Sequence, residues 1–282
     1  MRSSRRFMIF VRAAALAALV VVAFAACAGG EETETSEANS EPRNTRSKLD
    51  RILEEGVIRV GTPGDFNPMT FVNPDTGEYE GYYIDVAKDL AADMGVEVEW
   101  VATTWRDIVS GIAADRYDIA TGASYNMGRA TQGAFTHPIA QVGTVPLMLE
   151  ANADRFDSWE SINQEGVKVA VTLGTVFDEQ AQLFFPNAEI VAVESPARDF
   201  QEVLAGRADV SITSNIEAGS LIETYPEMMI VPIDAPRNNN ANGMIVPRGD
   251  QVFLNYVNTW ITMRDYAGYF DELSEEWGLV SF

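Results

Sequence analysis

Apolar runs of strand length alternate with amphipathic stretches of helical length along most of the chain. The run 57–60 (VIRV) is rich in β-branched residues, residues 84–94 repeat apolar side chains at helical spacing, and 96–101 (VEVEWV) again predict a strand. The apolar residues that share one face of the predicted helix are Ile84, Ala87, Leu90, Ala91 and Met94. Strand, helix and strand in this order predict βαβ units and an α/β fold.

The same alternation begins again after residue 150. Residues 167–172 (VKVAVT) predict a strand that ends in a small-residue turn before a helix, and further elements follow as far as a polar turn at 236–243 (PRNNNANG). Two final helices within 250–278 are expected to pack back on the first half. This pattern predicts two lobes, joined by two strands, with a ligand cleft between them. The predicted domains are lobe 1 from 47–149 plus 243–282 and lobe 2 from 150–242.

The N-terminus has the pattern of an export signal. Four arginines precede the apolar run 13–26, and Phe24-Ala25-Ala26-Cys27 has the small residues before a cysteine that a bacterial lipobox requires. We predict a lipoprotein signal peptide at 1–26, lipidation of Cys27, and a disordered tether at 27–46, which lacks large apolar side chains. The protein is therefore expected outside the cytoplasm, anchored to a membrane. The alternative is an ordinary signal peptide with an incidental cysteine.

Composition excludes several classes of function. Cys27 is the only cysteine of the 282 residues, so the folded part has no disulfide and no cysteine-based nucleophile or metal site. The formal net charge of -22 makes nucleic acid an improbable partner. The single His137 has neither a nucleophile motif nor a second histidine beside it. We predict no metal, no cofactor and a monomer.

A short loop follows the first predicted strand. Gly61, Pro63 and Gly64 end the strand and leave Asp65 and Phe66 on an exposed loop, the place where open α/β sheets bind ligands. The run 56–90 (GVIRVGTPGDFNPMTFVNPDTGEYEGYYIDVAKDL) resembles the first lobe of type II periplasmic solute-binding proteins of family 3. Within them it is most similar to the cyclohexadienyl dehydratase-like branch. The resemblance implies a two-lobe α/β fold with a two-strand hinge.

Arg129 is the strongest candidate for ligand binding. It lies at the start of a helix-like stretch, 126–135, directly after the small-residue strand end TGASYN. A guanidinium there can hold a carboxylate through two hydrogen bonds, and the resemblance implies this role. Ser124 and Asn126 are expected beside the same carboxylate. The alternative is a solvated arginine on a helix surface.

Two aromatic residues are predicted at strand ends. Phe66 in PGDFNP and Trp105 in TTWRD can form apolar walls of the cleft or stack on a ligand ring. Core packing is the alternative for both.

The turn 173–180 (LGTVFDEQ) is expected to meet the ligand from the second lobe. The resemblance implies contacts from Gly174, Thr175 and Val176 to the ligand carboxylate. In cyclohexadienyl dehydratases the start of this helix carries a glutamate that acts as general acid. Asp178 takes that place here, one methylene shorter, and its alternative role is an acidic residue in the first turn of a helix.

Two departures from the resembling families concern the ligand. Ser214, in TSNIEA, replaces the aspartate with which many amino-acid binders pair an α-ammonium group. Asn242 replaces a lysine of the dehydratases. The first weakens the interpretation as an amino-acid binder, and the second weakens the interpretation as a dehydratase. We expect both residues to line the cleft.

These patterns favour a solute-binding lipoprotein that captures a small carboxylate-bearing ligand, amino acid-like or an aromatic organic acid, for an ABC-type membrane permease. The alternatives are an enzyme, a prephenate or arogenate dehydratase with Asp178 as proton donor, and a ligand sensor for a membrane receptor.

Overall fold

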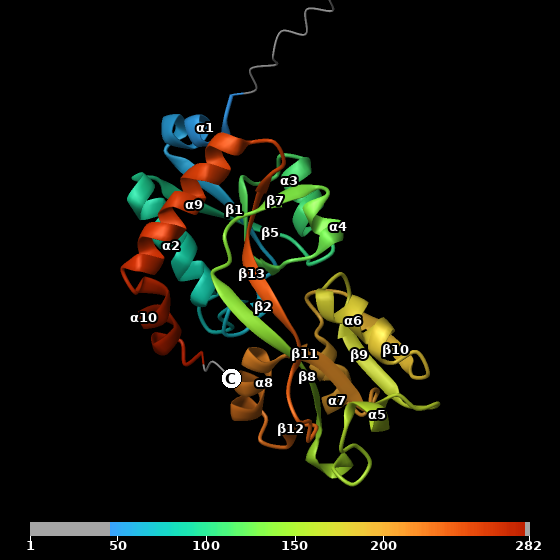
Figure 1. Ribbon diagram of the computed structural model, residues 1–282. Helices are drawn as coiled ribbons and strands as arrows, with labels where there is room; N and C mark the ends of the chain where they lie inside the picture. The colour runs from blue at the N-terminus through green and yellow to red at the C-terminus, as the bar shows by residue number, and fades with distance from the viewer. Residues whose placement is uncertain (1–45, 280–282) are drawn as a thin grey trace, which may run out of the picture. The chain divides into compact units, whose positions relative to one another are not determined.

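The computed structural model describes residues 46–279 (Figure 1). The predicted signal peptide, the lipidation site Cys27 and all but the last residue of the predicted tether lie outside this range. None of the helices between residues 46 and 279 combines the length and the apolar character that crossing a bilayer requires.

Ten strands form one mixed sheet in the order β10-β9-β11-β8-β13-β6-β1-β5, with β12 on β8 and β7 on β13. The pairs of β1 with β5 and β6, and of β9 with β10 and β11, are parallel. The strands are β1 (Val57–Thr62), β5 (Glu97–Ala102), β6 (Ile119–Ser124), β7 (Gly133–Phe135), β8 (Ala140–Leu149), β9 (Lys168–Thr172), β10 (Glu189–Val193), β11 (Val210–Ser214), β12 (Met228–Ile230) and β13 (Arg237–Pro247). A small separate sheet contains β2 (Asp65–Phe66), β3 (Thr70–Val72) and β4 (Tyr79–Glu80).

The buried apolar residues form cores on either side of β8 and β13. We call lobe 1 the part around the core that spans Ile52 to Ile139 and resumes from Met244 to Leu273. Lobe 2 surrounds two core clusters between Val142 and Val231. The exact residue limits of the predicted domains stay a prediction, since β8 contributes to both sides.

Helices cover both lobes, and the last two return to lobe 1 as expected (Figure 1). Lobe 1 has α1 (Lys48–Glu55), α2 (Tyr82–Met94), α3 (Ile108–Ala113), α4 (Met127–Ala130), α9 (Gln251–Tyr266) and α10 (Tyr269–Glu276). Lobe 2 has the 3-10 helix η1 (Glu150–Asn152), α5 (Trp159–Ile162), α6 (Val176–Phe184), α7 (Asp199–Leu204) and α8 (Asn215–Thr224). The apolar face predicted for α2 is buried throughout, and Gly95, with φ of 71°, ends that helix in the left-handed conformation that glycine adopts freely.

Two expectations about local structure were wrong. The predicted polar turn at 236–243 is largely strand, because β13 begins at Arg237 and pairs with β8 over Ala140 to Thr144. Asparagine has a low strand propensity, but pairing with a long neighbour overrides it, and the register is irregular between Arg237 and Asn240. The helix-like stretch 126–135 holds only the four-residue α4, because its last residues form β7 against β13.

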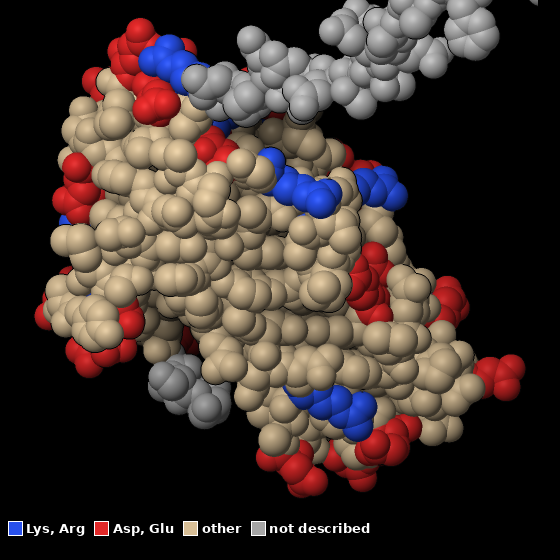
Figure 2. Space-filling model, turned by 45° about the horizontal axis from the view of Figure 1, so that its top comes forward, with Lys and Arg blue, Asp and Glu red and all other residues tan. Residues whose placement is uncertain are grey.

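Charge is distributed unevenly over the surface. On the face shown in Figure 2, acidic side chains lie mostly around the margin, and the middle carries few charged residues. An ion-pair cluster lies at the start of β6, where the carboxylate of Asp118 is wholly buried. It accepts hydrogen bonds from the side chain and the backbone N–H of Arg59, at 2.8 and 2.9 Å, and from Arg51 of α1. This cluster fixes α1 to the sheet.

Substitution of Asp118 should destabilise lobe 1. Asp118→Asn leaves the cations of Arg51 and Arg59 without their buried partner, and we expect a loss of about 2 to 4 kcal/mol in the free energy of unfolding. Chemical denaturation measures this loss. Asp115→Asn is the control, because Asp115 pairs with the same Arg59 but is mostly exposed, and a loss below about 1 kcal/mol is expected there. Equal losses of unfolding free energy in the two variants would show that burial of the carboxylate does not determine its contribution to stability.

Candidate functional site

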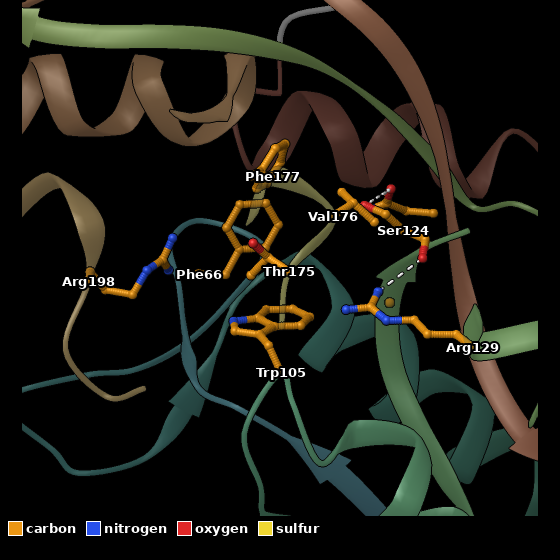
Figure 3. A pocket seen from close by; sticks show the side chains of 10 residues that line it. Phe66, Trp105, Ser124, Arg129, Thr175, Val176, Phe177 and Arg198 are labelled. Atoms are coloured by element: carbon orange, nitrogen blue, oxygen red, sulfur yellow. Dashed lines mark hydrogen bonds between the residues drawn. The ribbon is translucent and has the colours of Figure 1, made fainter. Parts of the chain in front are cut away.

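A cavity lies between the two lobes, with about 350 Å³ of empty space that includes open solvent at its mouth. It opens at the carboxyl ends of β1 and β6 in lobe 1 and beyond β9 in lobe 2, which is the ligand edge of an open α/β sheet. Figure 3 shows its walls from close by. The lining residues are Phe66, Trp105, Gly122, Ser124, Arg129, Thr175, Val176, Phe177, Arg198 and Asn242.

Arg129 is a buried cation without a carboxylate partner. Only 9% of the residue is exposed, and none of the ion pairs among residues 46–279 includes it. Its Nη1 donates to the carbonyl oxygen of Ser124 at 3.0 Å, and its Nη2 donates across the cleft to that of Gly174 at 2.9 Å. Burial lowers the pKa of Arg129 to about 10. A buried anion beside this guanidinium would be strongly stabilised.

Phe66 and Trp105 form one apolar wall of the cavity. Their rings meet edge to face with centroids 6.0 Å apart. The prediction of an exposed loop at Phe66 was wrong, because Phe66 lies in β2 and is buried beneath the facing lobe. Both aromatic residues lie between Arg129 and Arg198 in the view of Figure 3.

The loop before α6 forms the opposite wall. Thr175 caps α6, since its Oγ1 accepts from the backbone N–H of Asp178 at 3.3 Å while donating to the carbonyl oxygen of Thr172 at 2.7 Å. Val176 and Phe177, which carry the first N–H groups of this helix, line the cavity. The positive end of the α6 dipole therefore lies at the cavity and favours a negative charge there.

Gly174 allows the two lobes to approach closely. Its φ of 79° is left-handed, and a Cβ atom at this position would lie 2.7 Å from the Cα atom of Arg106 in lobe 1. Only glycine tolerates both this left-handed φ and this close approach of the Arg106 backbone. Gly174 itself is not among the lining residues, but its carbonyl oxygen is the acceptor that Arg129 reaches.

Asp178 is buried but does not line the cavity. Its Oδ2 accepts from the backbone N–H of Gly174 at 3.3 Å, and its Oδ1 accepts from Gln182 at 2.9 Å. These bonds hold the turn before α6, as expected of an acidic residue in the first turn of a helix. The neighbouring Glu179 accepts from the amide of Asn126 at 2.5 Å, a bond that joins the lobes at the rim of the cleft.

Asp65, next to Phe66 of the aromatic wall, also forms hydrogen bonds between the two lobes. Its carboxylate accepts from Trp105 Nε1 at 2.8 Å and from Ser195 Oγ of lobe 2 at 2.6 Å. Its carbonyl oxygen accepts from Arg198. The structure therefore places Asp65 and Asn126 in contacts between the lobes, outside the set of lining residues.

Asn242 and Ser214, the two residues that differ from the resembling families, lie in different places. Asn242 lines the cavity, and with its amide nitrogen facing β6 it donates to Ser124 Oγ at 3.1 Å. Ser214 is fully buried and caps α8, with its Oγ accepting from the backbone N–H of Glu217 at 3.0 Å. Ser214 does not line the cavity.

Sequence reasoning did not identify Arg198. Its guanidinium is buried and donates to Glu217 at 2.7 Å and to Thr172 Oγ1 at 3.0 Å. The next residue, Asp199, accepts from the hydroxyl of Thr172 at 2.7 Å. Arg198 lies directly before α7, where an arginine is commonly solvated, and only the tertiary structure shows that it lines the cavity.

The comparison with known families decides the classification. Residues 58–280 match the family model of the bacterial extracellular solute-binding proteins, family 3. The chain belongs to this family. The family assignment confirms the predicted resemblance and the predicted two-lobe α/β fold.

Two relatives show the range of the family. The chain is 33% identical over 232 residues to the cyclohexadienyl dehydratase of Pseudomonas aeruginosa, which covers 82% of this chain and 86% of that protein. It is 24% identical over 230 residues to the L-cystine-binding protein TcyJ of Escherichia coli, with 81% and 85% covered. One is named as an enzyme and the other as a binding protein, so membership alone does not distinguish them.

Solved structures agree on the fold. An ancestral amino acid-binding protein, described as a precursor of cyclohexadienyl dehydratase, has a TM-score of 0.76 at 36% identity and covers 82% of this chain and 99% of its own. An ancestral arginine-binding protein bound to arginine has a TM-score of 0.72 at 26% identity and covers 79% and 98%.

The carboxyl group of Glu217 should make stability depend on pH. Burial raises its pKa from the ordinary 4.5 to about 7, so the folded protein binds a proton that the unfolded chain releases between these values. The contribution of Glu217 to stability is therefore fully present below about pH 4.5 and is lost as the pH rises through about 7. We expect the stability difference between wild type and Glu217→Gln to shrink over this window, measured by chemical denaturation. Glu223→Gln, exposed on the same helix, should show no such trend.

Proposed function

We propose that this protein captures a small carboxylate-bearing ligand outside the cytoplasm and presents it to an ABC-type membrane permease. In this proposal Arg129 from lobe 1 and the start of α6 from lobe 2 hold the carboxylate from opposite sides. Membership of the solute-binding family supports the general role. The export signal and lipobox pattern around Cys27 support the location and the membrane anchor.

The state of Arg129 is the observation that carries the proposal. A guanidinium taken out of water loses several kcal/mol of hydration free energy, and two carbonyl oxygens compensate only part of that loss. A ligand carboxylate can accept two hydrogen bonds from it and neutralise its charge. The N–H groups at the start of α6 add donors on the facing wall.

Closure of the lobes supports capture. Five polar contacts among the described residues span the cleft: Arg129 to Gly174, Asn126 to Glu179, Arg106 to Glu194, and Asp65 to both Ser195 and Arg198. These contacts belong to a closed arrangement, and they are few enough to be broken when the cleft opens. A ligand that binds both walls would favour the closed state through its differential affinity. The names of several relatives include ABC transporter binding proteins, which supports a permease as the partner.

Substitution of Arg129 tests the proposal. A panel of amino acids, aliphatic acids and aromatic acids is first screened by thermal shift, and the tightest carboxylate is titrated calorimetrically. Arg129→Met should weaken its binding about 100-fold or more, because a buried charge pair is lost. Arg116→Met is the control, since Arg116 is exposed and does not line the cavity. Unchanged affinity in Arg129→Met would remove Arg129 from the site.

A second candidate function is cyclohexadienyl dehydratase activity, which the 33% identity to that enzyme favours. General acid catalysis needs an ionisable side chain within hydrogen-bond reach of the leaving group. Among the lining residues of the described part of the chain there is no Asp, Glu, His, Lys or Cys. The hydrogen bonds that Asp178 accepts from the turn before α6 also oppose the role of proton donor.

We therefore expect no conversion of prephenate to phenylpyruvate, or of arogenate to phenylalanine, by the full chain. Product formation is followed by absorbance and chromatography. Turnover that Asp178→Ala abolishes would establish the enzyme instead, with Asp178 reaching the substrate in a rearranged cleft. Turnover that survives this substitution would point to a different acid.

A further inference from the structure

We propose that Arg198 makes the cleft select carboxylates that lack an α-ammonium group, namely α-keto and α-hydroxy acids with an apolar or aromatic side chain, over the amino acids of the same shape. This inference rests on the proposed function and specifies its ligand class. It departs from the relatives whose names refer to cystine, glutamine or other amino acids.

An α-ammonium group would find no anionic partner on the cavity wall. Of the ten lining residues, the charged ones are Arg129 and Arg198, and both are cations. A buried ammonium that lacks a carboxylate loses its hydration without compensation. The neutral Ser124, Thr175 and Asn242 offer hydroxyl and amide groups, which suit a keto or hydroxyl oxygen as well as an ammonium.

Two carboxylates next to lining residues, those of Asp65 and Asp178, are already hydrogen-bonded elsewhere, and the carboxylate of Glu179 accepts from Asn126. The carboxylate of Asp65 accepts from Trp105 and Ser195, and that of Asp178 accepts from Gly174 and Gln182. Ser214, where many amino-acid binders have an aspartate, is fully buried and its hydroxyl caps α8.

Arg198 presents its guanidinium to the cavity from lobe 2. Three of its five N–H groups have hydrogen-bond acceptors, in Thr172, Asp65 and Glu217. The guanidinium also lies 3.8 Å from the carboxylate of Asp65 and 3.5 Å from that of Asp199, and its other two N–H groups have no hydrogen-bond acceptor among residues 46–279. In the view of Figure 3 it approaches the aromatic wall from the side opposite Arg129. A ligand carboxylate on Arg129 would therefore direct the rest of the molecule toward a second cation, which accepts an oxygen and repels an ammonium.

The carboxylates beside Arg198 do not reverse this preference. Glu217 and Asp199 are buried beside the guanidinium, at 2.7 and 3.5 Å, and do not line the cavity, and burial raises the pKa of both carboxyl groups. With a pKa of about 7, the carboxyl group of Glu217 is partly protonated at neutral pH and neutralises less of the Arg198 charge than an ionised carboxylate would. The charged residues that line the cavity itself are both cations.

The remaining walls define the side chain of the ligand. Phe66, Trp105, Val176 and Phe177 surround the space with apolar and aromatic groups. Such walls favour a branched aliphatic or aromatic group over a polar one.

Matched pairs of ligands test the inference on the wild-type protein. The pairs are phenylpyruvate and phenyllactate against L-phenylalanine, and α-ketoisocaproate against L-leucine, measured by isothermal titration calorimetry. We expect the keto or hydroxy acid to bind about 100-fold more tightly than the amino acid, because placing like charges together costs several kcal/mol. Equal or tighter binding of the amino acid would overturn the inference. A lack of binding by every member of both pairs would also overturn the inference. The proposed function would then still be tested separately, by the broader carboxylate panel and by Arg129→Met.

A double variant tests whether Arg198 causes the preference. Arg198→Met combined with Glu217→Gln removes the cation together with the carboxylate nearest to it, at 2.7 Å, while Asp199 and Asp65 lose ion-pair contacts of 3.5 and 3.8 Å. The affinity of the keto or hydroxy acid divided by that of its amino acid should fall about tenfold or more, chiefly because the amino acid is no longer repelled and binds more tightly. Arg116→Met should leave the ratio unchanged. An unchanged ratio in a folded double variant, verified by circular dichroism, would show that Arg198 does not set the specificity.

Discussion

The pairing of β8 with β13 is the interaction on which the rest of the structure depends. These strands are the only described pair that contributes to the sheets of both lobes: β8 continues to β11 in lobe 2, and β13 continues to β6 in lobe 1. Side chains support the pairing, since Gln180 of α6 accepts from Thr144 at 2.6 Å and donates to Asn240 at 3.1 Å. The asparagine-rich sequence of β13 thus provides polar partners at a place where an apolar strand would leave buried groups unsatisfied.

The cavity follows from this arrangement. Because the parallel strands of each lobe run toward the same interlobe edge, the residues after β1, β6 and β9 face one another. The lobes then meet through a few polar contacts and one close backbone approach at Gly174. The buried apolar residues fall into separate clusters for the two lobes, and Ile216 packs against a cluster of each.

The sequence predicted the features that local patterns control. The strand at 57–60, the amphipathic helix with Ile84 and Leu90, and the family were recognised because periodicity and turn residues are encoded locally. Most of the predicted lining residues do face the cavity, notably Arg129, Phe66 and Thr175. Their role in ligand binding stays a prediction.

What the sequence could not predict depends on contacts between distant residues. The strand at Arg237–Pro247 forms because β8 is there to pair with it, and Asp65 is drawn into contacts with Ser195, which is 130 residues away. Arg198 was missed for the same reason, since its burial comes from Thr172 and Glu217 on other elements. No local pattern distinguishes such an arginine from an exposed one.

The hydrogen bond from Arg129 to the carbonyl oxygen of Gly174 has a kinetic and thermodynamic consequence. Under the proposed function, a ligand carboxylate that takes over this N–H donor of Arg129 replaces the carbonyl oxygen of Gly174 as its acceptor. The apparent dissociation constant would then equal the intrinsic constant divided by the fraction of molecules in which this bond is open. The same bond would re-form when the ligand leaves, which would lower the free energy of the protein after release.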